Sequence, residues 1–154
     1  MKARDIMVTD VPVITIKATV AQAVQILKDN YGDESFINAA PGLIVLGERG
    51  GLAGILTPLS VITAIIGDMS EVTAAAKEDE SFFAERCGKI GSLPVSEIME
   101  RHAISVTEDA DIVDIAELFV QHRFQRLPVV KGNRVIGIIY RSSLLFAMTE
   151  KMTP

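Results

Sequence analysis

Apolar residues recur at the spacing of an amphipathic helix in two well-separated segments, residues 20–30 and residues 112–121. In each segment they fall at positions i, i+3, i+4 and i+7, which places them on one helical face. They are Val20, Ala23, Val24 and Leu27 in the first segment and Ile112, Ile115, Ala116 and Phe119 in the second. Thr19 and Asp111 precede these runs, where an N-cap residue is expected. The pattern predicts two amphipathic helices that each cover an apolar surface.

Short runs rich in Val, Ile and Leu flank both helices and are typical of buried strands. The runs are residues 13–16, 43–46 and 52–56 around the first helix and residues 104–106, 127–130 and 135–139 around the second. Segments with turn chemistry, 47–51 and 131–133, join the last two runs of each set. An apolar, helix-like segment then closes each set, over residues 59–66 and residues 144–148. Each half of the chain is thus predicted to have the order β-α-β-β-α.

The sequence also contains an internal repeat at the level of individual residues. The opening Asp5-Ile6-Met7 returns as Glu97-Ile98-Met99. The strand run of residues 43–46 returns as residues 127–130, and residues 52–56 return as residues 135–139. This ordered recurrence predicts two copies of one structural unit.

We therefore divide the chain into a first repeat over residues 1–66 and a second repeat over residues 94–154. The first repeat carries an insertion at about residues 31–41 that the second lacks. The linker, residues 67–93, is rich in Ala and Glu between Ser70 and Arg86 and is predicted to be partly helical, ended by Gly88, Gly91 and Pro94. It is long for a linker, so we expect it to pack on the module or on a partner.

The sequence resembles the tandem CBS domain pair, also called a Bateman module. The resemblance lies in the openings Asp5-Ile6-Met7 and Glu97-Ile98-Met99, the strand Leu127-Pro128-Val129-Val130, and the strand ends at Gly54 and Gly137. The resemblance covers nearly the whole chain except the insertion and the linker. It implies an α/β (α+β) fold of two CBS repeats with pseudo-twofold symmetry. Their three-stranded sheets would face each other, with helices outside and two clefts between the repeats. Family members often bind AMP, ADP, ATP or S-adenosylmethionine in these clefts, pair into homodimers and regulate another protein or domain.

Composition narrows the chemistry of this module. Of the 154 residues, 49% are hydrophobic but only 5% are aromatic, so the core must be aliphatic. The net charge of -5 argues against non-specific nucleic-acid binding, which needs a basic face. A single cysteine, Cys87, leaves no intrachain disulfide. No apolar run reaches the length of a membrane span or a signal peptide, so we expect a cytoplasmic protein without membrane insertion.

No motif of a catalytic site occurs in the sequence. There is no Gly-x-Ser-x-Gly, no Walker loop, and no paired carboxylates or nucleophile–histidine pair in a suitable arrangement. The two histidines and one cysteine lack metal-ligand spacing. We therefore expect no enzymatic activity, no metal site and no required cofactor, and any regulated activity would reside in an unknown partner protein.

The resemblance locates candidate ligand-binding residues after the third strand of each repeat. The family motif there is Gly-apolar-x-Thr/Ser-x-x-Asp, in which the hydroxyl contacts phosphate and the carboxylate takes the ribose hydroxyls. The first repeat keeps Thr57 but has Ser60 in place of the Asp, and the second has Tyr140 and Ser143 at the two positions. Loss of a charge-assisted hydrogen bond costs roughly 1.5–3 kcal/mol, so both departures weaken the case for a nucleotide site.

Several of these residues have two interpretations. Thr57 either contacts phosphate or is only the N-cap of the helix that Pro58 starts. Arg141 is either a bidentate phosphate clamp or an exposed surface charge. Tyr140 either stacks on an adenine or closes the cleft over itself.

The other candidates come from position alone. Arg123 and Arg126, ahead of the 127–130 strand, either approach the ligand phosphate or belong to a solvated loop. By the resemblance, the segments that enter the first strands hold the base. The candidates there are Val11, Val13, His102 and Ile104, and His102 is either a pH-sensitive contact or incidental.

Two functions remain open. The first is a regulatory module that senses an adenosine-type ligand, AMP, ADP, ATP or S-adenosylmethionine, in a cleft between the repeats and thereby controls a partner. The second is a non-catalytic dimerisation or docking module with degenerate, ligand-free clefts. Loss of the Asp at positions 60 and 143 favours the second function, and Thr57 with the neighbouring arginines favours the first.

Overall fold

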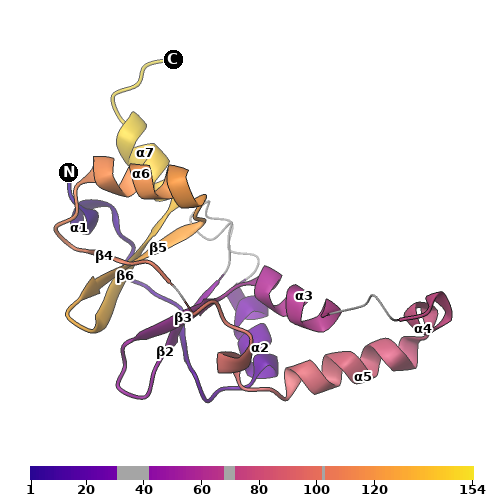
Figure 1. Cartoon of the computed structure of the whole chain (residues 1–154). Helices are drawn as coiled ribbons and strands as arrows, with labels where there is room; N and C mark the ends of the chain where they lie inside the picture. Colours follow the sequence, from indigo (N-terminus) through magenta and orange to yellow (C-terminus); the bar gives the residue numbers. More distant parts are fainter. Residues whose placement is uncertain (31–41, 68–71, 102) are drawn as a thin grey trace.

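Two three-stranded sheets form the centre of the molecule, with the order β1-β2-β3 in one and β4-β5-β6 in the other (Figure 1). The computed structural model describes residues 1–30, 42–67, 72–101 and 103–154. The predicted insertion at residues 31–41 and the candidate His102 lie outside the described residues. The predicted α/β class and the duplicated three-stranded sheets are confirmed.

The first half follows the predicted order of elements. Its elements are β1 (Val13–Thr15), α2 (Val20–Asn30), β2 (Leu43–Leu46), β3 (Leu52–Leu56) and α3 (Pro58–Ile66). Strands β1 and β2 are parallel because α2 crosses between them, whereas the tight 47–51 turn makes β2 and β3 antiparallel. Thr19 caps α2 as predicted, since its Oγ1 accepts a hydrogen bond from the Gln22 amide at 3.2 Å.

The second half repeats this order with small differences from the prediction. Its elements are β4 (Val106–Thr107), α6 (Ile112–His122), β5 (Arg126–Lys131), β6 (Arg134–Tyr140) and α7 (Arg141–Thr149). The last helix begins at Arg141, earlier than the apolar run alone predicted. Asp111 occupies the N-cap position of α6 but makes no capping bond with its side chain. Its carboxylate instead accepts a hydrogen bond from Lys2 Nζ at 2.6 Å, which lowers the pKa of that carboxyl.

The opening segment of each repeat packs on the other half of the molecule. The short helix α1 (Ala3–Ile6) places the fully buried Ala3 in the second core, beside Ile115 and Phe119. Conversely, the 3-10 turn η2 (Val95–Glu97) places Val95 in the first core. Each hydrophobic core is therefore closed by a segment that precedes the opposite repeat in sequence.

Backbone hydrogen bonds fix both crossing segments to the last strand of the opposite sheet. Val8 exchanges two bonds with Ile138 of β6, at 2.8 and 2.9 Å. Glu100 exchanges two with Ile55 of β3, at 2.9 and 3.0 Å. These matching pairs extend each sheet by one bridge and tie the two halves together.

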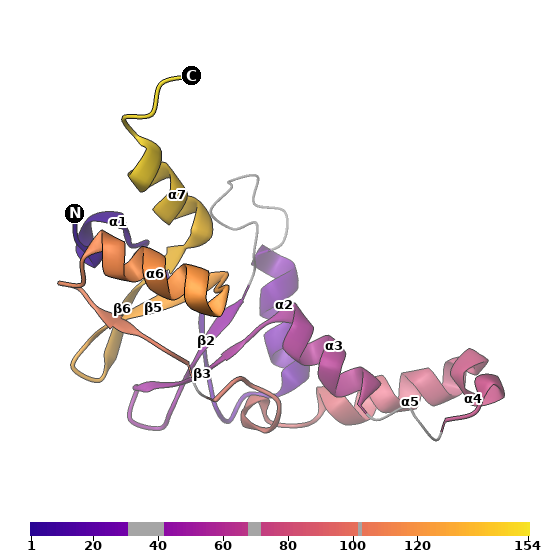
Figure 2. The ribbon, with the colours of Figure 1, turned by 45° about the horizontal axis from the view of Figure 1, so that its top comes forward.

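The two sheets also face each other across an aliphatic seam, as predicted. Alternation along β2 turns Leu43 and Val45 toward the core of the first half and Ile44 toward the opposite sheet. Ile44 packs there with Ile55, Ile138 and Tyr140. Figures 1 and 2 show the helices on the outer sides of the two sheets.

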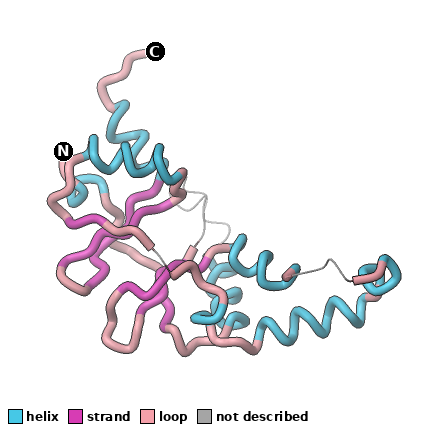
Figure 3. The backbone as a smooth tube through the Cα atoms, viewed as in Figure 1, coloured by secondary structure: helices cyan, strands magenta, loops and turns pink. Residues whose placement is uncertain are grey.

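The linker forms two helices, α4 (Ala74–Glu78) and α5 (Glu80–Gly91), that extend away from the sheets (Figures 2 and 3). The prediction that the linker packs on the module is confirmed for α5, which contacts α2 and α3. Arg86 of α5 donates to the carbonyls of Ile65 (2.6 Å) and Ile66 (3.2 Å) at the end of α3. Of the residues predicted to end the helix, Gly91 is the last residue of α5, whereas Gly88 lies within it.

Within the described residues, no helix is long and apolar enough to span a membrane.

Two glycines allow the crossing segments to approach the sheets. A methyl group on Gly54 would overlap the carbonyl oxygen of Glu100 and lie 2.8 Å from Met99 Sδ, and one on Gly137 would lie 2.7 Å from Met7 Sδ. The Met7 side chain can move away from an added methyl group, whereas the backbone carbonyl of Glu100 cannot. We therefore expect Gly54→Ala to lower the free energy of unfolding by about 3 kcal/mol and Gly137→Ala by about 1 kcal/mol, measured by urea denaturation.

The matched control is Gly88→Ala, since nothing lies within 4 Å of the added methyl group. Because Gly88 is inside a helix, this change is expected to raise stability by up to about 1 kcal/mol. Equal losses at Gly54 and Gly88 would contradict the close approach of the 99–100 segment to β3.

Candidate ligand pocket

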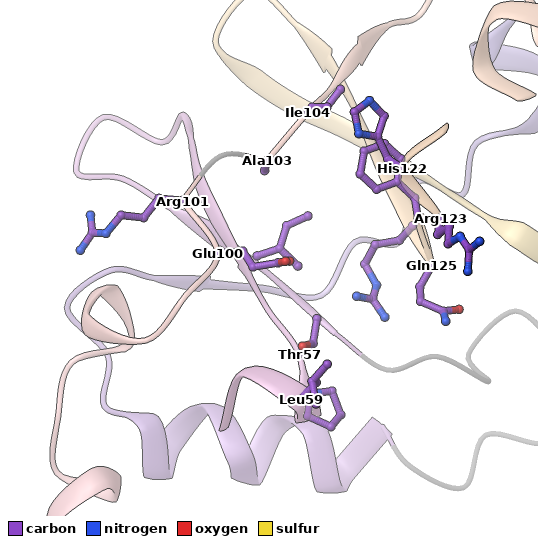
Figure 4. A pocket seen from close by; sticks show the side chains of 13 residues that line it. Thr57, Leu59, Glu100, Arg101, Ala103, Ile104, His122, Arg123 and Gln125 are labelled. Atoms are coloured by element: carbon purple, nitrogen blue, oxygen red, sulfur yellow. The ribbon is translucent and has the colours of Figure 1, made fainter. Parts of the chain in front are cut away.

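A cavity of about 850 Å³ opens between the two halves of the molecule (Figure 4). This volume is in the range of small-molecule binding sites. The first half contributes the end of β3 and the start of α3. The second half contributes residues 100–101 and 103–104 and the turn between α6 and β5. The lining residues are Ile55, Thr57, Pro58, Leu59, Glu100, Arg101, Ala103, Ile104, His122, Arg123, Phe124, Gln125 and Arg126.

The N-terminus of α3 forms one wall of this pocket. Thr57 Oγ1 accepts a hydrogen bond from the Ser60 amide at 3.1 Å, and Ser60 Oγ accepts one from the Thr57 amide at 3.2 Å. The two hydroxyls lie 3.0 Å apart. This reciprocal capping box confirms the N-cap interpretation of Thr57 and occupies the Ser60 hydroxyl, and Ser60 is not among the lining residues. The positive end of the helix dipole favours an anion at this wall.

The opposite wall is the turn that links α6 to β5. Arg123 ends α6 in the left-handed conformation, with φ 56° and ψ 39°, an uncommon backbone state for a residue with a side chain. Arg141 of α7 holds this turn from behind, because its guanidinium donates to the carbonyls of Arg123 (2.5 Å) and Phe124. Arg141 is therefore bonded to the backbone of the pocket wall and does not line the pocket.

Arg126 brings a buried positive charge to the pocket. It is only 7% exposed, so the solvated-loop interpretation is wrong for this residue. Its guanidinium packs against the backbone of Gly42, where a methyl group would lie 2.7 Å from Arg126 Cζ. Burial lowers the pKa of Arg126, while the nearby Tyr140 and Glu100 oppose this shift. An arginine guanidinium stays protonated in a protein even when it is buried, so Arg126 keeps its positive charge.

The lining residues give the pocket a local charge opposite to that of the whole chain. In the described part of the chain they include the three arginines 101, 123 and 126 and one acidic residue, Glu100, although the chain has a net charge of -5. His122 and Phe124 add a stacked aromatic pair, with ring centroids 4.9 Å apart. The arrangement suits a small anion that also carries an apolar or planar part.

Three polar residues of the pocket correspond to side chains of other types in the repeat. In the sequence register of the two repeats, Thr57, Arg126 and Glu100 correspond to Tyr140, Gly42 and Val8. The Tyr140 ring is 6% exposed and packs in the seam, with Val8 and Val11 against the same cluster. Burial raises the pKa of Tyr140, which keeps the phenol neutral. The repeat-related position thus has an apolar residue, a glycine and a buried ring.

The structure brings some of the predicted site residues together and separates others. Thr57, Ile104, Arg123 and Arg126 line the pocket, whereas Ser60, Val11, Val13, Tyr140, Arg141 and Ser143 do not. Val13 is 43% exposed, and the Ser143 hydroxyl is buried with no hydrogen-bond partner among the described residues.

Sequence reasoning missed Glu100, Arg101, Phe124 and Gln125. Glu100 directly follows the repeated Glu97-Ile98-Met99 opening, but no motif marks its side chain as facing a cavity. In the part of the chain that the structure describes, no group of three His, Cys, Asp or Glu side chains could hold a metal ion.

Comparison with known proteins agrees with this architecture. The CBS domain family model matches residues 3–67 and 95–150. The CBS domain-containing protein YhcV of Bacillus subtilis is 27% identical over 136 residues, which is 88% of this chain and 77% of YhcV.

Two solved structures have the same fold at low sequence identity. A CBS domain-containing protein of unknown function from Kribbella flavida is 22% identical, with a TM-score of 0.75 over 97% of this chain and 98% of that chain. CBSX2 in complex with AMP is 19% identical, with a TM-score of 0.72 over 99% of both chains.

The buried ring of Tyr140 generates a stability prediction. Tyr140→Ala is expected to cost about 3–5 kcal/mol, because it empties part of the seam. Tyr140→Phe keeps the ring and is expected to cost less than about 1 kcal/mol. Chemical denaturation measures both, with Val120→Ala on the exposed side of α6 as a control that changes stability by less than about 0.5 kcal/mol. A small loss for Tyr140→Ala would mean that the ring does not fill the seam.

Proposed function

The chain belongs to the CBS domain family, and on this basis we propose that it is a regulatory module that senses an adenosine-type ligand between its repeats. The candidate ligands are AMP, ADP, ATP and S-adenosylmethionine, and the ligand-bound module would control a partner protein. The observation that carries the proposal is the cavity of about 850 Å³ between the halves, lined by three arginines and the start of α3.

The chemistry of the lining supports a nucleotide. Arg123, Arg126 and the N-terminus of α3 supply positive charge for a phosphate group. Ile55, Ile104 and Phe124 supply apolar surface for a planar base. The similarity in fold to CBSX2, which was solved with AMP, gives further support to an adenine nucleotide.

A ligand in this pocket would act on the relative placement of the two halves. It would contact the start of α3 in the first half and the 122–126 turn in the second, so it stabilises the arrangement in which both walls fit. Such differential binding shifts the population toward one arrangement. The arm formed by α4 and α5 is tied to the end of the same helix, α3, by Arg86 and provides a route to a partner.

We expect one nucleotide to bind per chain, because Tyr140 fills the position that corresponds to Thr57. Isothermal titration calorimetry with AMP, ADP, ATP and S-adenosylmethionine measures the stoichiometry. A ligand at 100 times its Kd raises the free energy of unfolding by about 2.7 kcal/mol, which a thermal shift detects. No stabilisation by any of the four at millimolar concentration would contradict the sensing function.

Arg123→Gly tests the site with little risk to the fold, since glycine readily adopts the left-handed backbone of residue 123. We expect affinity to fall about tenfold through loss of one charged contact, with stability unchanged or raised. Arg49→Ala, in the exposed turn after β2, is the matched control that keeps full affinity. Equal affinities of the two variants would remove Arg123 from the site.

A non-catalytic dimerisation or docking module remains the second candidate, and the exposed apolar side chains favour it. Helices α3 and α7 present large side chains that are about half or more exposed: Leu59, Ile62, Ile66, Leu145, Phe146 and Met148. Exposed apolar side chains of this size are frequent at interaction sites, and we propose a homodimer. Light scattering distinguishes the candidates, since a tight dimer that ignores all four nucleotides would favour docking over sensing.

A further inference from the structure

Resting on the proposed function, we propose that Glu100 supplies the carboxylate that binds the ribose hydroxyls of the ligand. Positions 60 and 143, where the resemblance places that carboxylate, both hold serine. Among the described residues that line the pocket, Glu100 is the only acidic one. It comes from the second repeat, although it lies against the third strand of the first.

The backbone of Glu100 is held in a fixed position relative to Thr57. Its two backbone hydrogen bonds with Ile55 attach it to β3. Ile55 is two residues before Thr57, the N-cap of α3. Figure 4 shows the Glu100 side chain above Thr57, directed toward the wall that carries Arg123 and Gln125. A carboxylate in this place is available to accept two hydrogen bonds from vicinal hydroxyls.

Ser60 cannot readily take over this role. Its hydroxyl is bonded to the Thr57 amide and lies 3.0 Å from the Thr57 hydroxyl, and it does not line the pocket. To reach a ligand, Ser60 would have to leave the capping box that starts α3.

The charge of Glu100 also selects which part of a ligand can lie beside it. A carboxylate repels a phosphate group at close range, so we expect the anionic end of the ligand on the side of Arg123, away from Glu100. A neutral group with hydroxyl donors is left for the region near Glu100. Ribose has this character, and it connects the phosphate to the base in an adenosine nucleotide.

The repeat provides an internal control for the fold. Val8 occupies the position that corresponds to Glu100 and makes the same pair of backbone hydrogen bonds, with Ile138. The structure at this position therefore forms with an apolar side chain, and the carboxylate of Glu100 is not required for it. This comparison supports a role of Glu100 in binding.

The test compares the affinity for AMP with that for 2′-deoxy-AMP, measured by titration calorimetry on the full chain. The wild-type protein is expected to bind AMP about tenfold more tightly, because only AMP offers both hydroxyls. In Glu100→Gln the affinity for AMP should fall to near that for 2′-deoxy-AMP, so the preference disappears. Glu100→Val, which copies the residue at position 8, should lose the preference in the same way with an unchanged melting temperature.

The matched control is Glu97→Gln, an exposed residue of the same segment that does not line the pocket, and it should keep the wild-type preference. Retention of the tenfold preference in both Glu100 variants would overturn this inference while leaving the sensing function intact. Absence of a preference in the wild-type protein would overturn it as well. If neither AMP nor 2′-deoxy-AMP binds the wild-type protein, the inference fails, and if ADP, ATP and S-adenosylmethionine also fail to bind, the proposed function fails with it.

Discussion

The exchange of opening segments between the two repeats is the constraint on which the rest of the structure depends. The core of each half is completed by residues that precede the other half in sequence, with Ala3 in the second core and Val95 in the first. Met7 lies on Gly137 and Met99 lies on Gly54, so each segment reaches the edge of the opposite sheet. Neither half can bury its apolar surface alone, and the two sheets are held face to face across the aliphatic seam.

The pocket is a consequence of this arrangement. The crossing of the second opening segment brings Glu100, Arg101, Ala103 and Ile104 to the end of β3, beside the start of α3. The first segment crosses in the same way, but Val8 and Val11 pack into the seam beside Tyr140. An approximately symmetric backbone therefore carries an asymmetric set of side chains. Thr57 and Glu100 line the pocket, whereas the corresponding Tyr140 and Val8 pack in the seam.

Much of the fold could be predicted from the sequence because the helical and strand periods are clear. The 3.6-residue spacing of Val20 to Leu27 and the recurrence of the same pattern after Ile112 predicted both helices and the duplication. The helix cap at Thr57 followed from local chemistry alone. Asp111 shows the limit of such local rules, because its cap position is correct but its side chain bonds to Lys2, far away in sequence.

The site was less predictable, because several of its residues meet only through contacts between segments far apart in sequence. Thr57 could be found from a motif that is local in sequence, whereas Glu100 enters the pocket only through the crossing of its segment. The sequence alone could not show whether Arg141 contacts a ligand. In the structure its guanidinium donates hydrogen bonds to the carbonyls of Arg123 and Phe124. The burial of Arg126 against Gly42 joins two positions that correspond in the repeat, and the sequence register alone does not indicate that they touch.

Native-state hydrogen exchange of the amides of Val8, Ile138, Ile55 and Glu100 tests the central claim most directly, because their bonds close the two crossings. If the exchanged segments join the halves into one cooperative unit, all four amides exchange only by global unfolding, with the same free energy and the same dependence on denaturant. If the pair in one half exchanges through a separate opening of lower free energy while the other pair stays protected, the halves are independent and the account is contradicted.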